Sequence, residues 1–73
     1  MIEFNAKRTG ERIKELRLEL EISQTKLASQ IGVASNTLTQ YEKGTASPSL
    51  TVLVRLAFAL NTTTDYLFGI KEE

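Results

Sequence analysis

The sequence predicts an all-α fold of five short helices in a single domain. Its 73 residues are the length of one small domain. Apolar residues recur at helical spacing, as Ile13, Leu16 and Leu20 do near the start of the chain. Glycines and small polar residues punctuate the chain at short intervals, where helices of this length would begin and end. These observations favour helices and no strands.

Most of the predicted helices are bounded by residues suited to helix ends. They span residues 9–20, 24–31, 35–43, 50–60 and 64–68. Three hydroxyl side chains stand at N-cap positions, where they can accept hydrogen bonds from free first-turn amides: Ser23, Ser49 and Thr63. Helices are expected to end at residues that tolerate left-handed backbone: Gly32, Gly44, Asn61 and Gly69. We place the start of the first helix near Thr9 or Gly10.

The predicted core lines the inward faces of these helices. Its members in the first four helices are Ile13, Leu16, Leu20, Leu27, Ala28, Ile31, Leu38, Tyr41, Leu50, Leu53, Leu56, Ala57 and Leu60. Val33 lies in a tight turn and is expected to fill the space between two helices. Leu20 is expected to pack against Ile2 and Phe4.

The composition excludes several classes of function. The chain has no Cys and no His, which removes disulfides, thiolate chemistry, the commonest zinc ligands and the commonest general base. No nucleophile, base or metal cluster is visible, so we predict a protein that is not an enzyme and binds no metal or cofactor. The longest apolar stretch, residues 52–60, is too short to span a membrane. We therefore expect a cytoplasmic protein without membrane contact.

Residues 23–44 contain the main motif, two short predicted helices joined by a tight turn with glycine: SQTKLASQIGVASNTLTQYEKG. Such a pair is the helix-turn-helix motif. The segment closely resembles the helix-turn-helix of the Cro/C1-type repressors, also called the xenobiotic-response-element family. The resemblance continues through three further segments, ERIKELR, SPSLTVLVRLAFAL and DYLFG.

This resemblance implies a lambda-repressor-like DNA-binding domain. We expect the domain over residues 9–69, with the helix-turn-helix at 23–43. Residues 1–8 would form an N-terminal arm, and residues 70–73 a C-terminal tail.

The resemblance also implies that the third helix recognises bases in the major groove of double-stranded DNA. The family's base-contacting positions hold Ser35, Asn36, Thr39 and Gln40. Asn and Gln can pair bidentately with adenine, whereas Ser and Thr suit several bases. The alternative is an ordinary polar surface, although such a helix would more often hold Glu, Lys or Ala. The helix has no Arg for guanine, so we expect either a site biased to A·T at the recognised positions or modest specificity.

Phosphate contacts are expected from side chains around the motif. The candidates are Gln24, Lys26, Thr37, Lys43 and Arg17. Lys26 stands in a first helical turn, where the dipole prefers an acid, which favours a neighbouring phosphate over an indifferent surface lysine. The resemblance further implies an ion pair between Arg17 and Glu42; the alternative is an exposed, unpaired acid.

The overall charge balance does not indicate nucleic-acid binding, because the formal net charge is zero and the pI is about 6.3. A DNA-binding face must therefore arise from local sorting of charge. Four cations cluster near the first helix: Lys7, Arg8, Arg12 and Lys14. They alternate with glutamates, so phosphate contacts and a solvated, salt-bridged face both stay open.

Several positions depart from the family's pattern, three of which bear on the predicted site and its surroundings. Ala34 stands where a capping Ser or Thr is usual, so the third helix either loses about 1 kcal/mol or is capped by Ser35 instead. Glu21 replaces a small residue at the exit of the first helix. Phe58 is a candidate dimer contact on an exposed patch. Its alternative is to fold as extra core onto aromatic residues near the C-terminus.

These features predict a transcriptional regulator, in which resemblance to phage repressors favours repression. One such domain recognises few base pairs, so we expect a homodimer on a palindromic operator with half-sites about 34 Å apart. The alternative is an antitoxin, or another interaction module of a toxin–antitoxin pair. Leu18 and Phe58 would then bind a partner protein.

Overall fold

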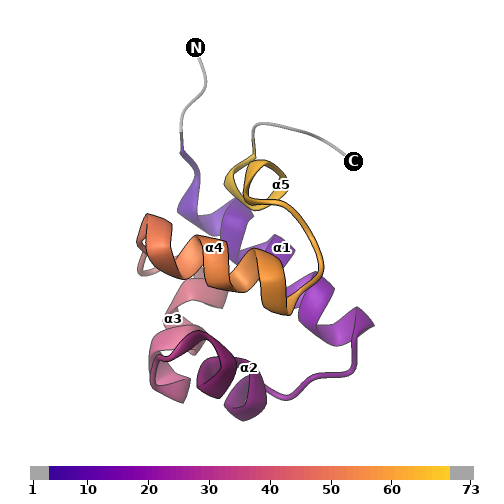
Figure 1. The fold of residues 1–73 in the computed structure, drawn as a ribbon. Coiled ribbons are helices and arrows are strands. Elements are labelled where there is room, and N and C mark those ends of the chain that lie inside the picture. The colour runs from indigo at the N-terminus through magenta and orange to yellow at the C-terminus, as the bar shows by residue number, and fades with distance from the viewer. Residues whose placement is uncertain (1–3, 70–73) are drawn as a thin grey trace.

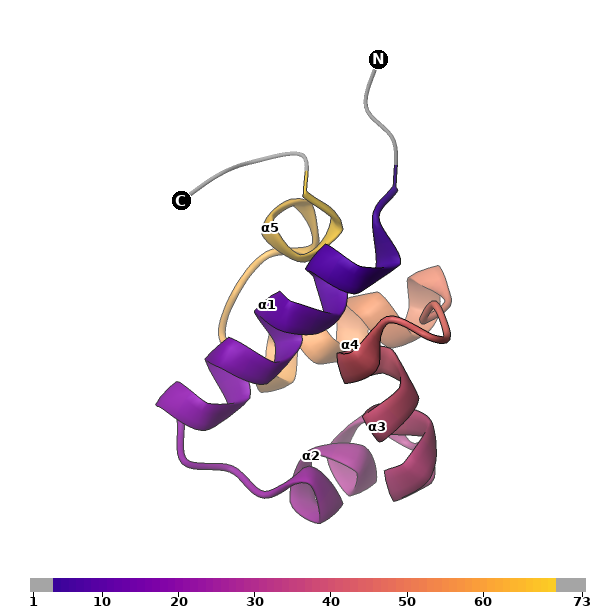
Figure 2. The same ribbon diagram turned by 180° about the vertical axis from the view of Figure 1, so that it is seen from behind.

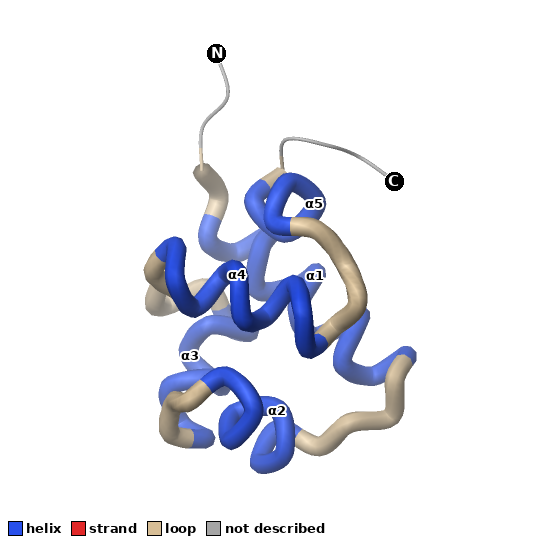
Figure 3. The backbone as a smooth tube through the Cα atoms, in the orientation of Figure 1, coloured by secondary structure: helices blue, strands red, loops and turns tan. Residues whose placement is uncertain are grey.

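The computed structural model describes residues 4–69, and all regular structure within that range is helical (Figures 1 and 3). The elements are α1 (Ala6–Glu19), α2 (Gln24–Ile31), α3 (Ser35–Lys43), α4 (Leu50–Ala59) and α5 (Thr64–Phe68). The predicted all-α fold of five short helices is confirmed. The bounds of α2, α3 and α5 are those predicted, and α4 ends one residue early.

The start of α1 was predicted wrongly. The helix begins at Ala6 because the Asn5 side chain accepts a hydrogen bond of 3.0 Å from the Arg8 amide. Residues 6–8, expected in an arm, therefore belong to α1. Thr9 is buried instead of capping, and its hydroxyl donates to the Leu67 carbonyl at 2.7 Å. Gly10 lies inside the helix.

The other predicted helix ends are confirmed. Ser23, Ser49 and Thr63 each accept a hydrogen bond from an amide in the first turn of the helix that follows. Gly32, Gly44 and Gly69 take the left-handed conformation, as does Asn61 at φ 56°. Glu21 also adopts φ 57° at the exit of α1, where a β-carbon is disfavoured.

The core forms where the helices meet, and most of its members were predicted. Ile13, Leu27, Ile31, Leu38 and Leu56 are completely buried. Two predictions were wrong. Leu50 is 68% exposed as the first residue of α4, and Leu20 is 46% exposed just after the last residue of α1.

Phe4 packs against a different residue from the one that the sequence predicted. The rings of Phe4 and Phe68 lie edge to face, with centroids 5.1 Å apart, and Phe4 therefore does not cover Leu20. Ile2, the other expected neighbour of Leu20, lies outside the described residues.

The helix-turn-helix occupies one end of the molecule. α1 packs on α3, α2 packs on both α3 and α4, and α5 packs on α1 and α4. Both ribbon views show α2 and α3 at the end opposite α5 (Figures 1 and 2). Within the described range, no helix combines the length and the apolar character needed to cross a membrane.

Candidate nucleic-acid interface

The turn between α2 and α3 is held by backbone hydrogen bonds. Gly32 turns the chain at φ 77°, and the Val33 amide donates to the Ala28 carbonyl at 3.0 Å. Ala28 is 1% exposed between the helices, and Val33 packs partly buried against the core. The angle between α2 and α3 is therefore set by packing as well as by the turn.

The predicted base-recognising residues lie together on α3. Ser35, Asn36 and Gln40 are exposed, and Thr39 is half-buried. The Thr39 hydroxyl is 3.1 Å from the Ser35 carbonyl and 3.4 Å from the Oε1 atom of Gln24. The opposite side of α3 is buried, so the helix presents one polar face outward.

The start of α3 has no side-chain cap. Ala34 is the N-cap residue, and its methyl group accepts no hydrogen bond. Ser35 is the first helical residue, so the alternative in which it caps the helix is wrong. The positions of the base-facing side chains along α3 are therefore those expected from the motif.

A buried ion pair ties α3 to α1. Arg17 donates from Nε to Glu42 Oε2 at 2.6 Å and from Nη2 to Oε1 at 3.2 Å. Both residues are 8% exposed. The ion pair that the resemblance implied is thus present, and the alternative of an exposed, unpaired acid is wrong.

Hydrogen bonds to Glu42 fix the side chains of both Arg17 and Gln24. Nη1 of Arg17 also donates to the Ile22 carbonyl at 2.9 Å. All three guanidinium nitrogens of Arg17 therefore make hydrogen bonds within the protein. Arg17 thus ties α1 to α3 and to the segment before α2, and its expected contact with a phosphate stays a prediction. Gln24 donates to Glu42 Oε1 at 3.0 Å, which fixes its side chain at the start of α2 beside Thr39.

Gly10 is a supporting residue that the sequence analysis missed. A β-carbon at this position would lie 2.2 Å from the Tyr41 carbonyl oxygen and 2.7 Å from that of Glu42. Only glycine lets α1 approach the backbone of α3 this closely. A glycine inside a helical pattern is the signal that could have indicated the contact.

Charge is sorted along the chain despite the neutral total. Between Glu21 and Asp65 the only acid is Glu42, which is buried and paired. Lys26 and Lys43 are exposed on the motif, and Thr37 is half-buried. The exposed surface of α2 and α3 therefore carries cations without competing carboxylates.

The cations near α1 have different positions. Arg12 is 1% exposed, donates to the Tyr66 carbonyl and lies 4.6 Å from the centre of the Tyr66 ring, so it belongs to the core. Arg8 pairs with Glu11 at 3.3 Å on the surface. Lys7 packs its backbone against Gly44, just after α3. Of the four, Lys7 is thus placed beside the end of α3.

Within residues 4–69, no group of acidic side chains is placed so that it could hold a metal ion. The features gathered at α2 and α3 are polar and cationic, and none is a nucleophile or general base arranged for chemistry.

Known proteins share both the sequence pattern and the fold. Residues 13–67 match the helix-turn-helix family. Over 46 residues, the chain is 46% identical to the cryptic phage CTXphi transcriptional repressor RstR of Vibrio cholerae, covering 63% of this chain and 41% of that protein. Over 63 residues, it is 33% identical to the HTH-type transcriptional regulator ImmR of Bacillus subtilis, covering 86% of this chain and 50% of that protein.

The fold comparison gives the same result. The crystal structure of the P22 c2 repressor, a protein of Salmonella phage P22, in complex with a synthetic operator matches with a TM-score of 0.80 and 35% identity. The match covers 82% of this chain and 91% of that one. The chain belongs to the helix-turn-helix family, in its Cro/C1 type. It spans half or less of the length of the two curated relatives named above.

Proposed function

We propose that the protein is a transcriptional repressor that binds double-stranded DNA sequence-specifically, as a homodimer on a palindromic operator. The observation that carries this proposal is the outward polar face of α3, held at a set angle by the turn and by the Arg17–Glu42 pair. A recognition helix needs such a rigid, exposed setting to enter the major groove. Action on DNA also implies a cytoplasmic location.

The structure supports different roles for the exposed side chains. Asn36 and Gln40 stand one turn apart on α3, and their amides suit adenine edges. Ser35 is exposed beside them, whereas Thr39 offers its methyl group from a half-buried position. These four residues are proposed as the base contacts.

Phosphate contacts are proposed from the flanks of the same face. Gln24 is fixed at the start of α2, where free amides and the helix dipole favour an anion. Lys26 lies in the first turn of α2, Thr37 lies in the first turn of α3, and Lys43 ends α3. Contacts of this kind orient a protein on DNA without selecting its sequence.

Fluorescence anisotropy with a duplex selected from a random library tests both sets of roles. Gln40→Ala should relax preference at one base position, because it removes a bidentate donor and acceptor. Lys26→Ala should weaken binding to all sequences alike and lower the salt slope by about one. Lys14→Ala is the matched control, since Lys14 is an exposed lysine of α1.

Two results would contradict the proposal. The first is equal affinity of the wild-type protein for selected and random DNA. The second is affinity that does not fall as salt is raised, because phosphate contacts release counterions. If Gln40→Ala and Lys26→Ala act identically on all sequences, the division into base and phosphate contacts is wrong.

An antitoxin role is the second candidate, and one observation favours it. Leu18 is 56% exposed near the end of α1. A toxin partner would cover this leucine. Co-purification of a second chain, lost in Leu18→Asp but kept in Lys14→Ala, would support that role; recovery of the chain alone would count against it.

A further inference from the structure

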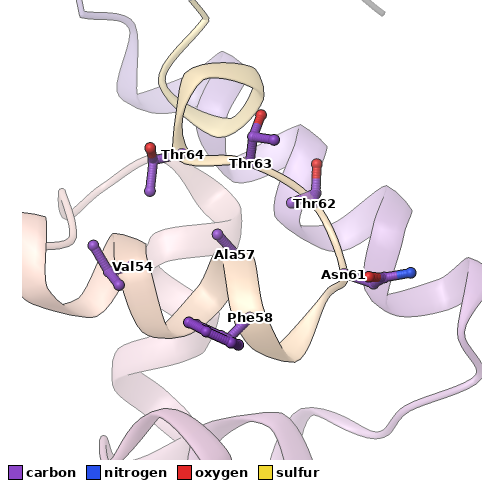
Figure 4. Close-up of a pocket in the computed structure, with 7 residues that line it drawn as sticks. All are labelled: Val54, Ala57, Phe58, Asn61, Thr62, Thr63 and Thr64. Atoms are coloured by element: carbon purple, nitrogen blue, oxygen red, sulfur yellow. The ribbon is translucent and has the colours of Figure 1, made fainter.

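Phe58 and Thr39 are two surface residues whose settings the core does not explain. Phe58 is 87% exposed beside a hollow of about 520 Å³, which is lined by uncharged residues of α4 and of the segment 61–64 (Figure 4). The alternative that Phe58 folds onto Tyr66 and Phe68 as extra core is therefore wrong, and its role as a dimer contact stays a prediction. Thr39 is half-buried on α3, and its hydrogen bonds bear on how the protein would select bases.

The amide of Gln24 is oriented by the carboxylate of Glu42. Glu42 is paired with Arg17, and its Oε1 atom lies 3.0 Å from the amide nitrogen of Gln24, Nε2. An ionised carboxylate only accepts hydrogen bonds, so the nitrogen end of the amide must face it. The amide oxygen of Gln24, Oε1, is thereby turned toward α3, where it lies 3.4 Å from the Thr39 hydroxyl.

This orientation determines how the Thr39 hydroxyl is used. Its two neighbours, the Oε1 atom of Gln24 at 3.4 Å and the Ser35 carbonyl oxygen at 3.1 Å, are both acceptors. The hydroxyl has a single proton, which these acceptors share, so none is left to donate to a base. The hydrogen bond to the carbonyl four residues earlier also restricts rotation of the side chain. The methyl group of Thr39 is therefore the part that is left to contact a base edge.

We infer that Thr39 selects a pyrimidine that carries a methyl group on C5, and that Gln24 is the residue that positions it. In the major groove, thymine is distinguished by its C5 methyl group, which a threonine methyl group can contact. Cytosine methylated at C5 carries the same group, so thymine and 5-methylcytosine are both accepted. Binding would then respond to cytosine methylation within the recognised site. The inference rests on the proposed function, because it places α3 in the major groove.

Duplexes with altered bases test the methyl contact without changing the protein. Each thymine of a half-site selected from a random library is replaced in turn by deoxyuridine, which lacks only the C5 methyl group. At one position this replacement should weaken binding of the wild-type protein about fourfold, the effect of burying one methyl group. At that position, 5-methylcytosine should bind about fourfold more tightly than cytosine. Thymines whose replacement has no effect serve as internal controls.

Variants at residue 39 assign the contact to the methyl group or to the hydroxyl. Thr39→Ser keeps the hydroxyl and removes the methyl group, so thymine and deoxyuridine should bind alike at that position. Thr39→Val keeps a methyl group and removes the hydroxyl, so it should retain the preference for thymine. Ser35→Ala is the matched control, since it truncates another residue on the exposed side of α3 and leaves the Ser35 carbonyl in place. It should not alter the ratio at this position.

Gln24→Met tests the positioning role separately. Methionine has a similar length but offers neither an amide donor nor an amide acceptor to hold Thr39. The ratio of the affinities for thymine and deoxyuridine should fall toward one. Loss of a phosphate contact alone would weaken both duplexes equally and leave the ratio unchanged, as expected for Lys26→Ala.

Three results would overturn the inference. One is that no thymine shows a deoxyuridine effect that depends on residue 39. Another is that Thr39→Val loses the preference as Thr39→Ser does, which would assign the contact to the hydroxyl. An unchanged ratio in Gln24→Met would overturn the positioning role. A wild-type protein that binds the selected half-site no better than random DNA would instead overturn the proposed function, and the inference with it.

Discussion

At the scale of single residues, the position of α3 depends on a carboxylate buried behind its exposed face. Glu42 is buried and receives hydrogen bonds from Arg17 and Gln24, which belong to the two other helices around it. Gln24 in turn lies within 3.4 Å of the Thr39 hydroxyl. One carboxylate thus links α1, α2 and, through Gln24, the exposed polar side of α3.

This arrangement predicts a large effect at Glu42. Glu42→Ala should lower the free energy of unfolding by about 3–5 kcal/mol, because it leaves the buried Arg17 guanidinium without its counter-charge. Replacing both partners, as in Arg17→Met with Glu42→Leu, should recover most of that loss. Thermal and urea unfolding measure both values. A loss below about 1 kcal/mol for Glu42→Ala, as for an exposed pair, would contradict the account.

At the scale of elements, the helix ends show what local sequence can predict. Ser23, Ser49 and Thr63 cap their helices as expected, because capping depends on residues within one turn. The start of α1 was missed because Asn5 caps it ahead of the first apolar residue of the pattern. The exposure of Leu50 could not be predicted locally, since it depends on which side of α4 the other helices cover.

The crossing of α1 and α3 is the element contact that positions the motif. Gly10→Ala should lower the free energy of unfolding by about 1–3 kcal/mol, because the new methyl group would overlap the backbone of α3. It should also weaken DNA binding by shifting α3. Glu15→Ala, at an exposed position of the same helix, should change stability by less than about 0.5 kcal/mol. Equal stability of the two variants in urea would contradict this role for Gly10.

At the scale of the whole molecule, the neutral net charge conceals a separation of acidic from basic residues along the chain. The glutamates of α1 lie in a different part of the chain from the motif, whose exposed charges are Lys26 and Lys43. The helix-turn-helix stands at one end of the molecule (Figure 1). The molecule presents two different surfaces, a polar one on α3 and one on α4 where Val54 and Phe58 are exposed.

The candidate DNA site could be predicted from sequence because it lies within one short motif. Its spacing places Ser35, Asn36 and Gln40 on the exposed face of α3. The full set of hydrogen bonds made by Arg17 could not be predicted, because its contact with the Ile22 carbonyl depends on the path of the chain after α1. The hollow beside Phe58 likewise arises only when the segment before α5 returns alongside α4.

The central claim is that the exposed face of α3 contacts DNA bases, and NMR amide mapping with a single half-site duplex tests it most directly. We predict that the largest shifts fall on Ser35, Asn36 and Gln40, including the side-chain amides of the last two, with smaller shifts near Gln24. Shifts confined to α5 or to the outer face of α4, with α3 unchanged, would contradict the claim.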